Sequence, residues 1–255
     1  MTQSQIAPNP LRMPGATLIT RLQVYDTVAP DGQIGGTPHF HFLCSEMYFV
    51  LAGSGAVEVI DANGFKRVEL APYSAFVFSP GTIHRLINPN RDLELLVIMQ
   101  NSGLPERGDN IVTFEDTILQ DDEAYASAMR VTNFDEAYVR RDRGVQGFLA
   151  LKAAFDHHPE VGKKALMRIF EQGAARTRQQ FDTWRTIISN GAVRESQGSL
   201  SFLESINTGD MDHLFHAQQA LILAGDANKP GFCGRLNRYF DPATLQFAPE
   251  GVSRA

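Results

Sequence analysis

Short apolar runs separated by turn residues dominate the chain from residue 46 to residue 101. The runs are rich in Val, Ile, Phe and Tyr, which favour strands, and their sequences are EMYFVLAG, SGAVEVIDANG, FKRVEL, AFVFS, IHRLIN and DLELLVIMQ. Asn63-Gly64, between two of these runs, is a strong hairpin signal. An earlier run over residues 16–25 predicts a first strand. Strands of this length at this cadence predict a sandwich or a closed barrel.

The period of the apolar positions becomes helical in the second half of the chain. Apolar residues recur at helical spacing over residues 134–155 and again over residues 166–188. Asn190-Gly191 predicts the end of the second of these helices, and Asp210 predicts the cap of a last one. The chain is therefore expected to carry a helical region behind its strands.

These patterns divide the chain into three parts. Residues 1–15 are expected to be an irregular N-terminal arm, because three prolines, Pro8, Pro10 and Pro14, deny it a helix. Residues 16–115 are expected to form the barrel, and residues 116–255 the helical C-terminal region. Since amphipathic helices must bury their apolar faces, we expect this region to pack on the barrel or on a partner subunit.

Composition excludes several classes of protein. The 255 residues are 43% hydrophobic, which is ample for a core. The net charge of −6 argues against a nucleic-acid partner, and no apolar run approaches the ~20 residues that span a bilayer. The two cysteines, Cys44 and Cys233, imply no disulfide framework, and the N-terminus shows no signal peptide. We expect a cytoplasmic protein without nucleic-acid or membrane partners.

Candidate metal ligands lie in the stretch PHFHFLCSEMYFVLAG. His39 and His41 are two residues apart, so on a strand they share a face. Glu46 follows a short turn and opens the next apolar run. Two imidazoles and a carboxylate that converge on one point suit a borderline divalent metal.

This stretch resembles the first motif of the cupin superfamily, in which HxH, four residues, Glu, six residues and Gly follow one another. The stretch SPGTIHRLIN resembles the second motif through Gly81, His84 and Asn88, and His84 is the fourth expected ligand. The departures are at turns: Ser79 stands at the proline position, Tyr73 at an upstream glycine, and Gln33 at the leading glycine of the first motif. The resemblance covers about the first hundred residues. It implies a jelly-roll barrel and a metal held by His39, His41, Glu46 and His84.

The whole chain also resembles bacterial cupin proteins that carry a helical C-terminal extension. The metal that the resemblance implies is one divalent transition ion, and iron, manganese, nickel, zinc and copper all accept these ligands. Alternation along the strands gives the expected cavity lining, which is Tyr48, Phe76, Phe78, Leu86 and Asn88. Tyr48 could instead be a half-buried barrel tyrosine, and Asn88 could instead bond a turn.

The resemblance implies oxygenases, isomerases and epimerases as common activities. We expect a metal-dependent, oxygenase-type enzyme acting on a small organic molecule, with an aromatic one favoured by the apolar lining. Glu46 could remain a ligand or act as the catalytic base. A sugar isomerase or epimerase would need cationic groups in the cavity, and Arg85 and Lys66 are expected to face away from it. A third possibility is a binding or sensing cupin without turnover.

The chain is expected to be a homodimer, because short barrels commonly protect an edge strand by pairing it. Several other residues are expected to lie outside the site. Glu58 and the arginines Arg140, Arg141 and Arg143 are expected to be solvated, and the stretch FCGR at residues 232–235 suggests no mechanism.

Overall fold

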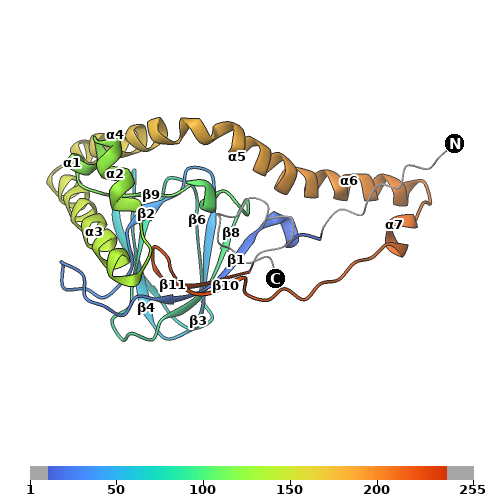
Figure 1. Cartoon of the computed structure of the whole chain (residues 1–255), viewed down its shortest axis with the longest axis horizontal. Helices are drawn as coiled ribbons and strands as arrows, with labels where there is room; N and C mark the ends of the chain where they lie inside the picture. Colours follow the sequence, from blue (N-terminus) through green and yellow to red (C-terminus); the bar gives the residue numbers. More distant parts are fainter. Residues whose placement is uncertain (1–10, 240–255) are drawn as a thin grey trace.

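The computed structural model describes residues 11–239, so most of the expected N-terminal arm lies outside the described residues. Two antiparallel sheets face each other, as Figure 1 shows. The first sheet has the order β10-β11-β1-β8-β3-β6, and the second has the order β5-β4-β7-β2-β9. The strand pattern predicted such a sandwich or barrel, and the cupin resemblance implied its jelly-roll form.

The strands of the first sheet, in chain order, are β1 Leu18–Val24, β3 Glu46–Ala52, β6 Ala75–Phe78, β8 Glu94–Met99, β10 Asp226–Pro230 and β11 Gly234–Tyr239. Those of the second are β2 His39–Phe40, β4 Gly55–Asp61, β5 Gly64–Leu70, β7 Ile83–Ile87 and β9 Ile111–Val112. Ala62 and Asn63 join β4 to β5 as a hairpin at the predicted place, and Gly64 is the first residue of β5.

The last two strands are an addition to the expected organisation. They lie in the C-terminal region, and β11 pairs along nearly all of β1, from Ile19 opposite Tyr239 to Val24 opposite Gly234. The chain therefore returns to the barrel after its helices and completes one edge of the first sheet. The glycine- and proline-rich composition of this segment hid its strands from the sequence pattern.

The helices, in chain order, are α1 Asp116–Leu119, α2 Asp122–Met129, α3 Phe134–His157, α4 Pro159–Thr177, α5 Phe181–Ile188, α6 Arg194–Asn207 and α7 Asp212–Phe215. Asp121 caps α2 by accepting from the backbone N–H of Ala124. Short 3₁₀ turns are Pro14–Ala16, Pro105–Arg107 and Arg178–Gln180.

Two helix boundaries differ from the expectation. Asn190-Gly191 does not stop the helix but lies in a π-helical turn, Ser189–Val193, that joins α5 to α6. The wider turn accommodates Gly191 without ending the run. The helix expected after Asp210 is only the single turn α7, and the chain from residue 217 to residue 224 has no regular structure.

Helices α2, α3 and α4 cover the outer face of the second sheet. Ile60 and Ile83 from the sheet share one buried cluster with Phe148, Leu151 and Ile169 from the helices. The helical region therefore packs on the barrel over this part. Beyond it, α5 and α6 form a rod that runs past the other end of the barrel (Figure 1).

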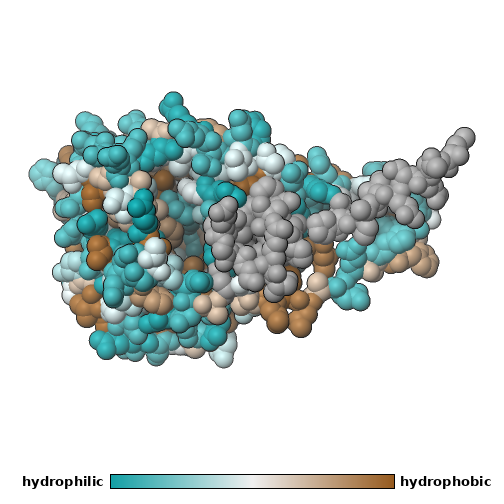
Figure 2. Space-filling view, viewed as in Figure 1, coloured by the Kyte–Doolittle hydropathy of each residue, from teal (hydrophilic) through white to brown (hydrophobic). Residues whose placement is uncertain are grey.

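The two helices of the rod differ, because α5 buries Trp184 and Ile187 whereas α6 contains no buried residue. Hydrophobic side chains are visible on the same end of the molecule in Figure 2. Among the described helices, none combines the length and the apolar character required to cross a membrane.

Candidate metal centre

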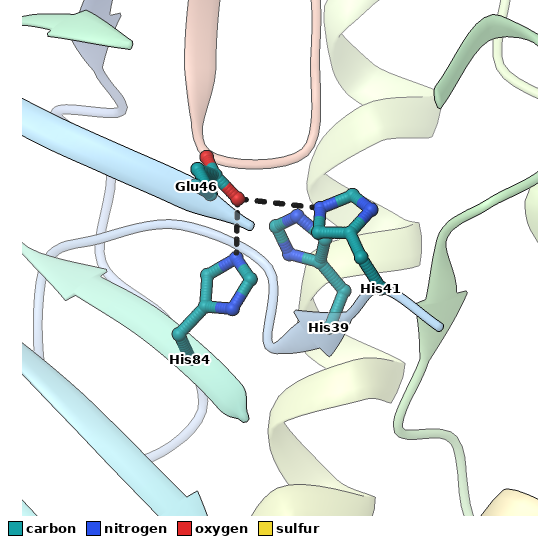
Figure 3. A group of neighbouring side chains, drawn as sticks. All are labelled: His39, His41, Glu46 and His84. Atoms are coloured by element: carbon teal, nitrogen blue, oxygen red, sulfur yellow. Dashed lines mark ion pairs between the residues drawn. The ribbon is translucent and has the colours of Figure 1, made fainter. Parts of the chain in front are cut away.

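Three strands bring the four expected ligands together. His39 lies on β2 directly opposite His84 on β7, His41 follows β2, and Glu46 is the first residue of β3. All four side chains are buried, and one ligand atom from each lies within 4.8 Å of the others. Figure 3 shows the three imidazole rings and the carboxylate converging on one point.

Backbone carbonyls fix the orientation of all three imidazoles. Nδ1 of His39 lies 2.9 Å from the carbonyl oxygen of Thr37, and Nδ1 of His84 lies 3.0 Å from that of Thr82. Nδ1 of His41 contacts the carbonyl oxygen of Asp109. Because a carbonyl oxygen only accepts, each Nδ1 carries the proton, and each Nε2 presents a lone pair. Such a partner on the far nitrogen is typical of histidines that bind metals.

Burial shifts the pKa of the groups in the cluster. It lowers the pKa of His39 well below its ordinary value and that of His84 to about 4. Burial alone would raise the pKa of Glu46, but the neighbouring His84 and His41 lower it overall. Burial also acts on His41, but the neighbouring Glu46 carboxylate outweighs it and raises the pKa of His41. Neutral His39 and His84 beside an ionised Glu46 are the protonation states that metal binding requires.

The donor atoms lack partners of their own. Nε2 of His41 and of His84 and Oε2 of Glu46 are buried without a hydrogen-bond partner among the described residues. The carboxylate oxygen lies 3.3 Å from Nε2 of His41 and 3.4 Å from Nε2 of His84, as the dashed lines in Figure 3 mark. Each such buried atom costs about 1–3 kcal/mol when unpaired. Three nitrogens and one carboxylate oxygen fit a divalent transition metal, which would satisfy all of them.

Asp109 supports the centre and was not anticipated from the sequence. Its fully buried carboxylate accepts from the backbone N–H groups of Phe42, Leu43 and Cys44, the loop between His41 and Glu46. Its carbonyl oxygen accepts from His41. Asp109 thus holds both a ligand and the turn between two ligands. The 62 residues between Glu46 and Asp109 conceal that link in the sequence.

A cavity of about 140 Å³ opens beside the ligands, with an apolar wall formed by residues Leu18, Leu22, Val97, Met99, Phe232 and Leu236. Tyr48 also lines it. The Tyr48 hydroxyl is buried and has no hydrogen-bond partner of good geometry among the described residues. A buried hydroxyl without a partner is available to a bound molecule.

The other residues expected to line the cavity lie elsewhere. The Phe78 ring packs 4.4 Å from the His84 ring, behind the ligand, and Phe76 packs on Phe78. Leu86 is buried in the core between the sheets. Asn88 donates to the carbonyl oxygen of Val24 and accepts from the N–H of Leu93, so it bonds a turn, the alternative given above.

Three of the charged residues expected to be solvated, Glu58, Arg140 and Arg141, are buried. Arg85 faces away from the cavity, as predicted, and its guanidinium donates twice to Asp31 at 2.6 and 3.1 Å. Glu58, only 5% exposed, joins this pair and lies 3.4 Å from Arg67. The loop over residues 26–35 covers the group. On α3, Arg140 and Arg141 are also buried, whereas Arg143 is exposed.

Comparison with known families agrees with the fold. Residues 25–99 match the family model described as the cupin domain. This part of the chain is a cupin domain, as the two motifs predicted, and it holds a buried candidate metal site of three histidines and one glutamate.

Similar solved structures align over a limited part of the chain. KdgF from Halomonas sp. is 25% identical with a TM-score of 0.23, over 26% of this chain and 57% of that one. The DMSP lyase DddQ from Ruegeria pomeroyi DSS-3 is 19% identical with a TM-score of 0.25, over 33% and 36%. The capsular polysaccharide assembling protein CapF from Staphylococcus aureus is 16% identical with a TM-score of 0.25, over 27% and 20%. The chain thus spans less than two thirds of each. No curated protein matches the chain.

Proposed function

We propose that this protein is a metal-dependent, oxygenase-type enzyme that acts on a small organic molecule of about one aromatic ring. The observation that carries the proposal is the buried set of His39, His41, Glu46 and His84, of which His39, His41 and Glu46 also line a largely apolar cavity. A site with these ligands would hold one divalent ion of iron, manganese, nickel, zinc or copper. Such an ion supplies Lewis-acid and, for the redox-active metals, electron-transfer chemistry.

The size of the cavity supports a one-ring substrate. Its volume of about 140 Å³ is close to that of an engineered apolar cavity of roughly 150 Å³ that binds benzene. The Tyr48 hydroxyl can donate to an oxygen atom on the bound molecule, because no described residue accepts from it with good geometry. We therefore favour an aromatic diol or a similar compound that combines an apolar ring with adjacent oxygen atoms.

The charge of the cavity argues against the sugar isomerase and epimerase alternative. Arg238 is the only arginine or lysine in the described lining, and it lies 3.7 Å from Glu106. A phosphorylated sugar would need several cationic partners. The remaining alternative, a sensing cupin without turnover, shares the binding site and differs only in chemistry.

Glu46 has two roles that the site allows. Its carboxylate is held ionised by two imidazoles, so it can bind the metal or accept a proton from the bound molecule. Glu46→Gln keeps the size and an oxygen donor but removes the charge. We expect this variant to keep much of its metal and to lose most activity.

Metal analysis and oxygen consumption test the proposal. Freshly purified protein is analysed for metal, and the reconstituted protein is assayed with catechol and other aromatic diols. His84→Ala should lose metal and activity together, whereas the exposed His157→Ala should lose neither. Unchanged metal content in His84→Ala would overturn the ligand set. Diol binding without oxygen consumption would favour the sensing alternative.

A further inference from the structure

The turn that joins β10 to β11 has no role in the proposed function so far, although it lies at the metal centre. Phe232 and Cys233, in this turn, line the cavity together with His39, His41 and Glu46. The faint red turn passes beside Glu46 in Figure 3. Almost 190 residues separate it from Glu46 in the sequence, so one wall of the cavity comes from the far end of the chain.

Hydrogen bonds hold this turn against the segment that follows β1 and the segment that leads into β2. The Tyr25 hydroxyl donates to the carbonyl oxygen of Gly231 at 2.8 Å, and the Tyr25 N–H donates to that of Cys233 at 3.0 Å. The N–H of Thr37 donates to the carbonyl oxygen of Phe232 at 2.9 Å. The turn is therefore a fixed part of the cavity wall.

A glycine in the approach to the ligands makes this contact possible. A Cβ atom on Gly36 would lie 2.6 Å from the Cα of Cys233, which no real side chain tolerates. Only glycine lets two backbones come this close. Gly36 thus has a packing role, beyond the turn that the glycine-rich segment before His39 suggests.

The ring of Phe232 is held between a ligand and a buried arginine. It stacks on the His39 ring with centroids 4.7 Å apart and planes 25° apart. The guanidinium carbon of Arg140 lies 4.3 Å from the centroid of Phe232, and the same guanidinium donates to the carbonyl oxygen of Gly231. Cation–π contact and hydrogen bond together fix both the ring and the backbone of the turn.

Cys233 and Tyr48 give this wall an uncharged polar edge. The thiol lies beside the Tyr48 hydroxyl, and its sulfur is buried. An aromatic face, a neutral thiol and a phenol hydroxyl together suit a flat, uncharged ring better than a charged or bulky molecule.

We propose that Phe232 and Cys233 determine the size and the flatness of the molecule that the site accepts, and that Arg140 is the positioning residue for this wall. The proposal rests on the proposed function and names the part of the cavity that selects the substrate. The Phe232 side chain limits the size of the cavity, so that it accepts a molecule of about one aromatic ring. Its removal opens the cavity toward α3, where Arg140 lies.

Binding of two diols to the cobalt(II)-loaded full-length protein tests this wall. The one-ring probe is catechol, and the two-ring probe is 2,3-dihydroxynaphthalene, both titrated against the visible absorption of cobalt. The wild-type protein should bind catechol more tightly. Phe232→Ala should shift the ratio of the two dissociation constants toward the larger probe by at least about tenfold, the scale at which pocket size discriminates. Arg140→Gln should shift it in the same direction by a smaller factor.

Two variants serve as controls. Phe232→Leu keeps an apolar side chain and replaces Phe232→Ala if that variant loses cobalt. Arg143→Gln changes an exposed arginine three residues along the same helix and should leave the ratio unchanged.

The outcomes separate this inference from the proposed function, because no readout needs turnover. An unchanged ratio in both Phe232 variants, no binding of either probe to any cobalt-loaded protein, or equal effects of Arg140→Gln and Arg143→Gln would overturn it. Size-selective binding without oxygen consumption would support the role of Phe232 and Cys233 in selecting the bound molecule, and it would refute the oxygenase activity.

Discussion

Helices α3 and α6 are both amphipathic in sequence, but the structure covers the apolar side of only one of them. On α3, Phe148 and Leu151 are buried against the second sheet. On α6, Leu200 and Leu203 remain more than half exposed. Helical periodicity predicts that an apolar face exists, but it does not say which surface covers that face.

Glycines account for part of the difference. A Cβ atom on Gly147 of α3 would lie 2.2 Å from the carbonyl oxygen of Thr113, so glycine lets this helix approach the barrel closely. Gly198 of α6 has nothing within 4 Å of the corresponding position. The sequence of α3 is therefore shaped to fit a partner within the chain, and that of α6 is not.

The largest effect should follow from removing all of the C-terminal region. A fragment ending at residue 115 loses α3 and α4, and it also loses β11, which pairs along nearly all of β1. Apolar surface and an unpaired edge strand would both be exposed. We expect the fragment to be poorly soluble and to show no cooperative thermal transition. A soluble monomer that melts as cooperatively as the whole chain would contradict this prediction.

A smaller effect is expected from a single cavity in the packed helix. Phe148→Ala removes a fully buried ring and should lower the free energy of unfolding by about 3–5 kcal/mol. The neighbouring Leu149 is 38% exposed, and Leu149→Ala should cost no more than about 1 kcal/mol. Urea denaturation measures both. Equal losses in the two variants would show that α3 does not pack as described.

Asp109 provides a test at the metal centre that leaves the ligands in place. Asp109→Asn replaces one of the two carboxylate oxygens that accept from the backbone at residues 42–44 with an amide donor. Loss of such a supporting group typically weakens metal binding by about 10–100-fold. Metal titration should show this loss, whereas Asp156→Asn, at an exposed position on α3, should bind metal normally. Unaltered affinity in Asp109→Asn would exclude a supporting role.

The parts of the centre that the sequence predicted share a local pattern. His39, His41 and Glu46 lie within eight residues, and their two-residue spacing places His39 and His41 on one face, while Glu46 follows after a short turn. His84 occupies the ligand position of the second cupin motif, so the resemblance to that family predicted it. The barrel was predicted from the length and spacing of its strands. The predictions of the barrel and of the ligands both needed only short-range information along the chain.

The parts that the sequence did not predict depend on contacts over long distances in the chain. Asp109 acts through backbone N–H groups, which any sequence provides, so no residue pattern marks its partners. Phe232 and Cys233 reach the cavity through a hairpin whose proline and glycine content conceals its strands. Arg140 resembled a solvated helix residue because its partners are a carbonyl oxygen and a ring from that hairpin.

The smallest effect on the fold is expected on α6, where a substitution instead tests the homodimer. Leu203 is 58% exposed and α6 has no buried residue, so Leu203→Ser should change the free energy of unfolding of the separate chain by no more than about 0.5 kcal/mol. We propose that a second copy covers this face, because stable interfaces bury about 20–30 residues on each side, and residues 194–223 are almost entirely exposed. Light scattering should then give two chains per particle for the wild-type protein and one for Leu203→Ser. Met167→Ser, at an equally exposed position on α4, should remain a dimer. One chain per particle in the wild-type protein would refute the homodimer, and a dimeric Leu203→Ser would place the interface on another surface.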